Sequence, residues 1–322
     1  MRKALIVGLN DYPGCPLSGC VNDAQAVADI ISKNEDGSPN FDVKTILNVV
    51  HQRTLMNNIC ELFDGKSDVE LLYFSGHGAF SNDISYIVTT DYSDYNYGIR
   101  LDDILNAANS SKAKHKIIVL DSCYSGAMGT PGLFGNTQAI IGDGLTILSS
   151  SMSNETSSEI NGHGLFTSLF LEALKGGAAD VTGNITPGSI YAYIDKALGP
   201  WEQRPVFKTN VSSFLSVRNV SPSVPLDCLR KITSYFSNAN DELNLNPSYE
   251  YTNNPKIEHK LVEPYSIDSN VAIFKNLQKL ESVGLVYPVG EEHMYYAAIN
   301  SKSCKLTPLG QHYWNLVKSG KI

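Results

Sequence analysis

The 322-residue chain is acidic and contains enough apolar residues for a full hydrophobic core. Its 25 Lys and Arg residues against 33 Asp and Glu residues give a formal net charge of -8, which disfavours general nucleic-acid binding and suits cationic substrates. Six cysteines without CxxC spacing argue against a disulfide framework or a zinc ribbon. We therefore expect reduced thiols in a cytoplasmic protein with one large domain and a smaller one.

The first residues predict a buried strand rather than an export signal. Met1-Arg2-Lys3 is followed by a short apolar stretch that Asn10 and Asp11 interrupt. No apolar stretch approaches the roughly 20 residues that a membrane-spanning helix needs. The sequence thus predicts no membrane partner.

Strand and helix patterns alternate over the first two thirds of the chain. The strands are expected at 3–8 and 43–49, at the apolar runs 71–74 and 117–120, in a hairpin-like stretch at 84–90, and at 145–149 and 205–208. The helices are expected at 22–32, 54–63, 101–108 and 165–174, and after Thr186, the expected N-cap before Pro187. This order predicts an α/β fold, a three-layer sandwich with a mostly parallel central sheet.

Two further segments differ in character from this alternation. Residues 124–144 contain six glycines and few apolar groups, which predicts a mobile loop that carries function. Prolines at 222 and 225 mark a domain boundary, so we expect a first domain at 1–220 and an extended junction at 221–254.

Residues 255–322 predict a small winged-helix-like module. Ile273, Leu277 and Leu280 form a helical stripe that ends at Gly284, and the segments 285–288 and 294–299 flank Gly290 as a β-hairpin before a final helix. From Pro225 onward ten basic residues balance ten acidic ones. Because DNA-binding winged helices usually carry a basic surface, a regulatory module that docks an activating protein is favoured over nucleic-acid binding.

Two apolar runs end abruptly in a reactive side chain among small residues. One run leads into Ser75-Gly76-His77-Gly78 and the other into Asp121-Ser122-Cys123. Parallel strands end at one edge of a sheet, where α/β folds bind ligands, so we expect His77 and Cys123 to meet there. An imidazole beside a thiol activates it as a nucleophile, and the backbone at Gly78 and Cys123 offers oxyanion donors. A buried core thiol and an ordinary loop histidine are the alternatives when each is taken alone.

In these motifs the chain resembles the caspase-like cysteine peptidases, and more closely the metacaspase and bacterial branch than the animal caspases. The resemblance covers about residues 3 to 210 and rests on four motifs in family order, which are Gly19-Cys20-Val21-Asn22-Asp23-Ala24, Tyr73-Phe74-Ser75-Gly76-His77-Gly78, Asp121-Ser122-Cys123-Tyr124-Ser125-Gly126 and Gly162-His163-Gly164-Leu165-Phe166-Thr167. It implies a caspase-like hydrolase with His77 as general acid and base and Cys123 as nucleophile.

The resemblance also implies a substrate pocket formed by Cys20, Asp23, Ser75 and Asp121. Animal caspases carry a glutamine where Asp121 stands, and two carboxylates would instead bind the arginine or lysine side chain before the scissile bond of a protein substrate. Asp23 as a partner of a helix dipole and Asp121 as a turn former remain the structural alternatives.

Metacaspases are often activated by calcium, although the peptidase chemistry needs no cofactor. The family's acidic cluster resembles Asp91, Asp102 and Asp103, whose oxygens suit this cation, while acids at helix starts are also common for structural reasons.

Self-cleavage in the glycine-rich loop is not expected for a peptidase that requires a basic residue. Residues 122–174 contain no lysine or arginine, whereas Arg230-Lys231 offers a site in the junction. Two other functions stay open: a caspase-like hydrolase with a different acyl substrate, and a catalytically silent adaptor or winged-helix regulator that binds DNA or protein.

Overall fold

The computed structural model describes residues 1–48, 50–81, 84–93, 96–123, 141–150, 163–199, 204–256 and 261–322. Within these ranges the chain divides into two compact units, Met1–Ser221 and Pro222–Ile322. None of the described helices combines the length and the hydropathy that a bilayer crossing would need.

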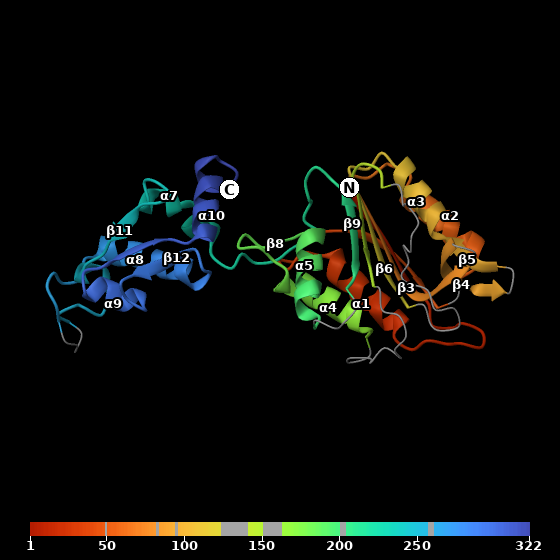
Figure 1. Cartoon of the computed structure of the whole chain (residues 1–322), viewed down its shortest axis with the longest axis horizontal. Coiled ribbons are helices and arrows are strands. Elements are labelled where there is room, and N and C mark those ends of the chain that lie inside the picture. The colour runs from red at the N-terminus through yellow and green to blue at the C-terminus, as the bar shows by residue number, and fades with distance from the viewer. Residues whose placement is uncertain are drawn as a thin grey trace. The chain divides into compact units, whose positions relative to one another are not determined.

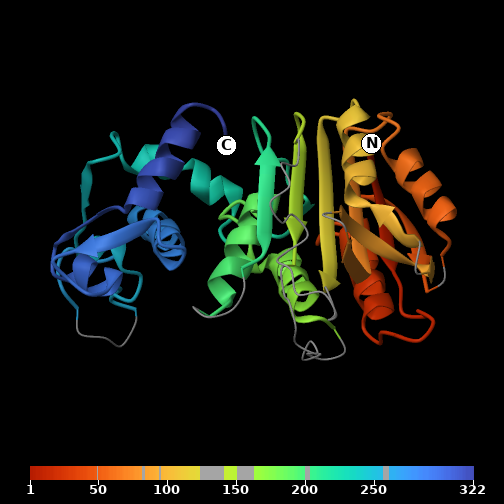
Figure 2. The ribbon, with the colours of Figure 1, turned by 45° about the vertical axis from the view of Figure 1, so that its right-hand side comes forward.

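The first unit is organised around a central sheet with the strand order β2-β1-β3-β6-β7-β9. Its members are β1 (Arg2–Gly8), β2 (Asp42–Leu47), β3 (Val69–Ser81), β6 (His115–Cys123), β7 (Leu145–Ser149) and β9 (Val206–Asn210). Neighbours from β2 to β7 are parallel, and β9 is antiparallel to β7. In Figure 2, β6 (yellow), β7 (yellow-green) and β9 (green) follow one another across the sheet.

An antiparallel extension continues the sheet beyond the far end of β3. There β3 pairs with β4 (Ile84–Ser93), which in turn pairs with β5 (Asn96–Arg100). A separate short ladder joins β8 (Asn184–Ile185) to β10 (Arg218–Asn219).

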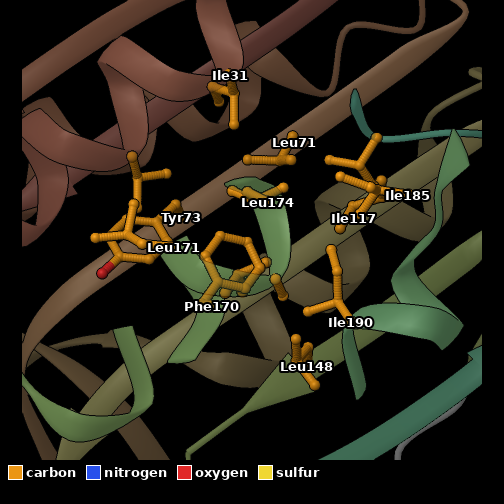
Figure 3. Close-up of a cluster of buried hydrophobic side chains, with 14 of the residues drawn as sticks. Ile31, Leu71, Tyr73, Ile117, Leu148, Phe170, Leu171, Leu174, Ile185 and Ile190 are labelled. Carbon is orange, nitrogen blue, oxygen red and sulfur yellow. The ribbon is translucent and has the colours of Figure 1, made fainter. Parts of the chain in front are cut away.

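Helices cover both faces of the central sheet (Figure 1). One layer comprises α1 (Cys20–Ser32), α4 (Leu165–Glu172), the π-helical turn η1 (Ala173–Gly177) and α5 (Pro187–Ala197). The other layer comprises α2 (Gln52–Leu62) and α3 (Leu101–Ser110). Strand alternation creates the two cores: Leu71 and Tyr73 of β3 pack with the first layer, whereas Leu72 and Phe74 pack with the second. Figure 3 shows side chains from α1, α4, η1 and α5 meeting Leu71, Tyr73 and Ile117 of the sheet.

The predicted α/β sandwich is confirmed in its element order and in its mostly parallel sheet. Thr186 caps α5 as expected, because its hydroxyl accepts from the backbone N–H of Ser189 at 3.1 Å. The predicted loop at 124–144 lies outside the described residues up to position 140.

The second unit contains a small antiparallel sheet of order β11-β13-β12 and several helices. Its strands are β11 (Glu242–Asn244), β12 (Val286–Val289) and β13 (Ser303–Leu306). Its helices are α6 (Leu226–Arg230), α7 (Ile232–Tyr235), the 3₁₀ turn η2 (Pro247–Tyr249), α8 (Asp268–Ser282), α9 (Met294–Ile299) and α10 (Pro308–Lys318). The winged-helix assignment of this unit stays a prediction.

Two expectations for the second unit were wrong. The segment 294–299 is helix α9 rather than a hairpin strand, since buried Met294, Ala297 and Ala298 follow helical spacing, and β12 pairs with β13 instead. The segment 221–254 was expected to be an extended junction, but it contains α6, α7, β11 and η2. It folds because its apolar residues are buried, although its composition is largely polar. These include Cys228, Leu229, Ile232 and Phe236.

Candidate active site

The four polar positions at the ends of β3 and β6 form two register pairs. Ser75 pairs with Asp121, and two residues further along His77 pairs with Cys123. Gly8 at the end of β1 pairs with Ser75 from the other side. Register partners on adjacent parallel strands lie about 4.8 Å apart along the hydrogen-bonding direction. The strand ends thus bring the backbone positions of the predicted nucleophile and base next to each other.

His77 is held in place by contacts to both its ring and its backbone. Its ring nitrogen Nε2 lies 2.8 Å from the carbonyl oxygen of Cys15, and its backbone N–H donates to the hydroxyl of Tyr12 at 3.1 Å. The ring of Tyr12 stacks at an angle on the imidazole with 4.6 Å between centroids. A side chain at Gly76 would overlap the Tyr12 hydroxyl, which explains the glycine there.

These contacts determine which tautomer the neutral imidazole adopts. A carbonyl oxygen only accepts hydrogen bonds, so Nε2 carries the proton and Nδ1 holds the lone pair. Burial lowers the pKa of His77, an effect that the hydrogen bond to the Cys15 carbonyl partly opposes. At neutral pH the ring is therefore mainly neutral and suited to act as a base.

Asp23 reaches the same edge of the sheet from the first turn of α1. The helix lies close to β1 because residue 8 is glycine, where a Cβ would overlap the Cys20 carbonyl oxygen. The Asp23 carboxylate is almost fully buried and accepts from Ser75 Oγ at 3.2 Å and from His163 Nδ1 at 2.8 Å. Burial raises the pKa of Asp23, and the hydrogen bonds from His163 and Ser75 act in the opposite direction.

Asp121 provides the second carboxylate at this edge of the sheet. Its Oδ2 accepts from the Thr167 hydroxyl at 2.5 Å, and that hydroxyl also contacts the hydroxyl of Tyr73 at 2.5 Å. Burial raises the pKa of Asp121 to about 6; the hydrogen bond from Thr167 opposes this rise, while the neighbouring Asp23 adds to it.

Gly164 lies against both carboxylates. A methyl group at this position would sit 3.2 Å from Asp121 Oδ2 and 3.7 Å from Asp23 Oδ2. Both acids therefore face one small region that a side chain at position 164 would occupy.

Two other predicted residues lie on the elements that carry Asp23 and His77. Cys20 is half-buried and begins α1, one turn before Asp23. Gly78 follows His77 on β3 and pairs in register with Ile87 of β4.

Of the three acids expected to bind calcium, Asp91 and Asp102 have separate local partners. Asp91 accepts from the backbone N–H of Gln52 at the start of α2, at 3.1 and 3.2 Å, and from the Thr89 hydroxyl at 2.7 Å. Asp102 and Asp103 lie in the first turn of α3, where Asp102 pairs with Arg100 at 3.4 Å. In the part of the chain that the structure describes, no three acidic, histidine or cysteine side chains gather as a metal site. Calcium activation stays a prediction.

Three residues at the site escaped the sequence analysis as site residues. Tyr12 and Cys15 position His77 from the loop after β1, and His163 contacts Asp23 from 140 residues away. The motif containing His163 and Thr167 was recognisable, but nothing in the sequence indicates which of its side chains faces the acids.

A histidine that is register-paired with a cysteine, at the carboxyl edge of an α/β sheet and beside two acids, is an arrangement typical of cysteine hydrolases. The family described as the caspase domain, peptidase C14, matches residues 1–263 of the chain, and the chain belongs to this family. It is thus a cysteine protease with protein substrates. No curated protein matched the chain.

Proposed function

We propose that the chain is an endopeptidase that cleaves after arginine or lysine, with Cys123 as nucleophile and His77 as general base. The observation that carries this proposal is the pair of carboxylates, Asp23 and Asp121, which converge on the space beside Gly164 next to the His77–Cys123 register pair.

The dyad acts by moving one proton between sulfur and nitrogen. The Cys123 thiol gives its proton to Nδ1 of His77, and the thiolate attacks the carbonyl carbon of the scissile peptide bond. The imidazolium then protonates the leaving amine, and the C–N bond breaks to leave a thioester. A water molecule that gives its proton to the same nitrogen hydrolyses the thioester. Throughout, the Cys15 carbonyl holds Nε2 and keeps the ring oriented.

The backbone N–H groups at Gly78 and Cys123 are assigned to stabilise the oxyanion that forms in each step. Gly78 follows His77 on β3, and Cys123 is the last residue of the neighbouring strand β6. One such donor contributes roughly 3 kcal/mol to the barrier reduction.

The preference for a basic residue follows from charge. Burial is the main cause of the raised pKa of Asp121, and repulsion from Asp23 adds to it; a guanidinium or ammonium group between the two carboxylates would relieve this repulsion. An acidic substrate side chain would increase it. Truncating one partner of a buried charge pair costs 2 to 5 kcal/mol by general experience, roughly 30-fold or more in binding.

The second unit is proposed to regulate the peptidase by docking an activating protein. Its balanced charge gives no electrostatic signal for nucleic acid. Several tyrosines are exposed on it, a residue type enriched at protein interfaces, namely Tyr251, Tyr265, Tyr287 and Tyr296.

Peptides that release a fluorophore after Arg, Lys or Asp test the proposal. The wild-type enzyme is expected to cleave the Arg and Lys peptides and not the Asp peptide. Cys123→Ala should abolish turnover, whereas Cys60→Ala, which removes an exposed thiol on α2, should leave it unchanged. Equal activity in wild type and Cys123→Ala would refute the dyad, and cleavage after Asp would refute the basic specificity. Absence of all turnover would favour the silent adaptor.

A further inference from the structure

We propose that His163 is a positioning residue for substrate recognition, which orients the Asp23 carboxylate so that its Oδ2 faces the substrate's basic side chain. This inference rests on the proposed preference for arginine or lysine. It assigns to His163 a role in binding the substrate rather than in the chemical step.

The two oxygens of the Asp23 carboxylate have different hydrogen-bond partners. His163 Nδ1 lies 2.8 Å from Oδ1, whereas Oδ2 accepts from Ser75 at 3.2 Å and lies on the side of Gly164. A hydrogen bond to each oxygen from a different element prevents the carboxylate from rotating. The side chain of Asp23 is only 3% exposed while that of His163 is 25% exposed, so the imidazole is the more accessible partner.

The same contact affects the charge of Asp23. Burial raises the pKa of this carboxyl group, and His163 is the largest of the influences that lower it. Asp23 in turn affects two buried neighbours: it raises the pKa of Asp121 on β6, and together with Asp121 and Cys20 it raises the pKa of Tyr73 on β3, in both cases in addition to the larger effect of burial. Without the donor at position 163, Asp23 would be protonated up to a higher pH and would lose its attraction for a cation.

Position 163 tolerates substitution because its other side is open. His163 also lines a groove of about 460 Å³ between α1 and α4, together with Ala26, Asp29 and Leu171. A smaller side chain would thus leave a solvent-accessible gap rather than a closed cavity. We expect variants at this position to fold.

Two variants test the role. His163→Ala removes the donor, and His163→Asn places an amide N–H where Nδ1 stands in histidine. For an arginine peptide, His163→Ala is expected to raise KM by at least about tenfold with little change in kcat, because a hydrogen bond to a buried charge is lost. The acidic limb of kcat/KM should move to higher pH. His163→Asn should restore most of the affinity and return the acidic limb of the kcat/KM profile to its wild-type pH.

Alkylation of Cys123 by iodoacetamide provides a readout that does not depend on the pocket. Its rate should be the same in wild type and both variants. An unchanged or lowered KM in His163→Ala would overturn the positioning role while leaving the proposed function intact, and so would failure of His163→Asn to rescue. A wild-type enzyme that is alkylated but cleaves no basic peptide would overturn both proposals.

Discussion

Replacing Asp121 with asparagine is expected to stabilise the protein while it weakens catalysis. Asparagine is close in shape to the protonated acid and keeps an oxygen that can accept from Thr167. It removes a negative charge that the folded protein accommodates poorly, as the raised pKa of Asp121 indicates. The carboxylate should therefore serve substrate binding at the expense of the fold.

The size of the effect follows from proton linkage. Burial, with a further contribution from Asp23, moves the pKa of Asp121 from its ordinary value of 3.8 to about 6 in the folded protein. Because the folded pKa is the higher one, the stability that this group contributes is fully present below pH 3.8 and is lost as the pH rises through 6. A shift of about two units corresponds to about 3 kcal/mol. Asp121→Asn should thus gain up to about 3 kcal/mol of unfolding free energy at pH 7.5.

Urea denaturation of wild type and Asp121→Asn at pH 4 and pH 7.5 measures this difference. The gain should shrink below about 1 kcal/mol at pH 4, where the wild-type acid is mostly protonated. Asp102→Asn, at an exposed acid in the first turn of α3, serves as the matched control and should not stabilise. A destabilised Asp121→Asn at pH 7.5, or a gain of equal size at both pH values, would contradict the reasoning.

Three further substitutions have defined outcomes. Gly164→Ala is compatible with the backbone at φ -61° and ψ 146°, but its methyl group would crowd the Asp121 carboxylate at 3.2 Å and occupy the space between the two acids. KM for basic peptides should therefore rise several-fold in steady-state assays, and an unchanged KM would show that the substrate binds elsewhere. Tyr12→Phe should lower the unfolding free energy by about 1 to 2 kcal/mol, because the buried backbone N–H of His77 loses its acceptor. Urea titrations measure this loss, and a stability equal to that of wild type would refute it. Asp91→Ala should cost about 1 kcal/mol equally in calcium and in chelator, since its carboxylate accepts from the α2 N-terminus; a loss seen only with calcium would instead support the metal site.

Much of the first unit was predictable because its strands are buried on both faces. Runs such as 71–74 and 117–120 are apolar at every position, and only a strand between two helix layers needs this pattern. The second unit was less predictable. Its helix α9 spans six residues, too short for periodicity to distinguish it from a strand, and the buried residues of α6 and α7 are scattered among polar ones.

In the candidate site, too, the features that depend on local sequence were predictable and those that depend on distant contacts were not. The adjacency of His77 and Cys123 follows from strand ends, which the sequence marks by a change from apolar to small residues. The partner of His77 is a backbone carbonyl at Cys15, and a carbonyl has no sequence signature. His163 contacts Asp23 only because the chain returns to this edge at the start of α4, a feature of tertiary structure.

The proposed substrate pocket and the proposed dyad have opposite requirements for solvent exposure. Low solvent exposure lowers the pKa of His77 and so keeps the base neutral, which favours proton abstraction from the thiol. The same low exposure raises the pKa values of Asp23 and Asp121 and so favours their neutral forms, which cannot attract a cation. Hydrogen bonds from His163 and Ser75 to Asp23, and from Thr167 to Asp121, oppose that rise in pKa. At neutral pH both requirements are met at once, because the lowered pKa of His77 leaves the imidazole neutral and Asp121, with a pKa of about 6, is charged. The proposed activity therefore has an acidic limit to which protonation of Asp121 contributes, in addition to protonation of the catalytic base.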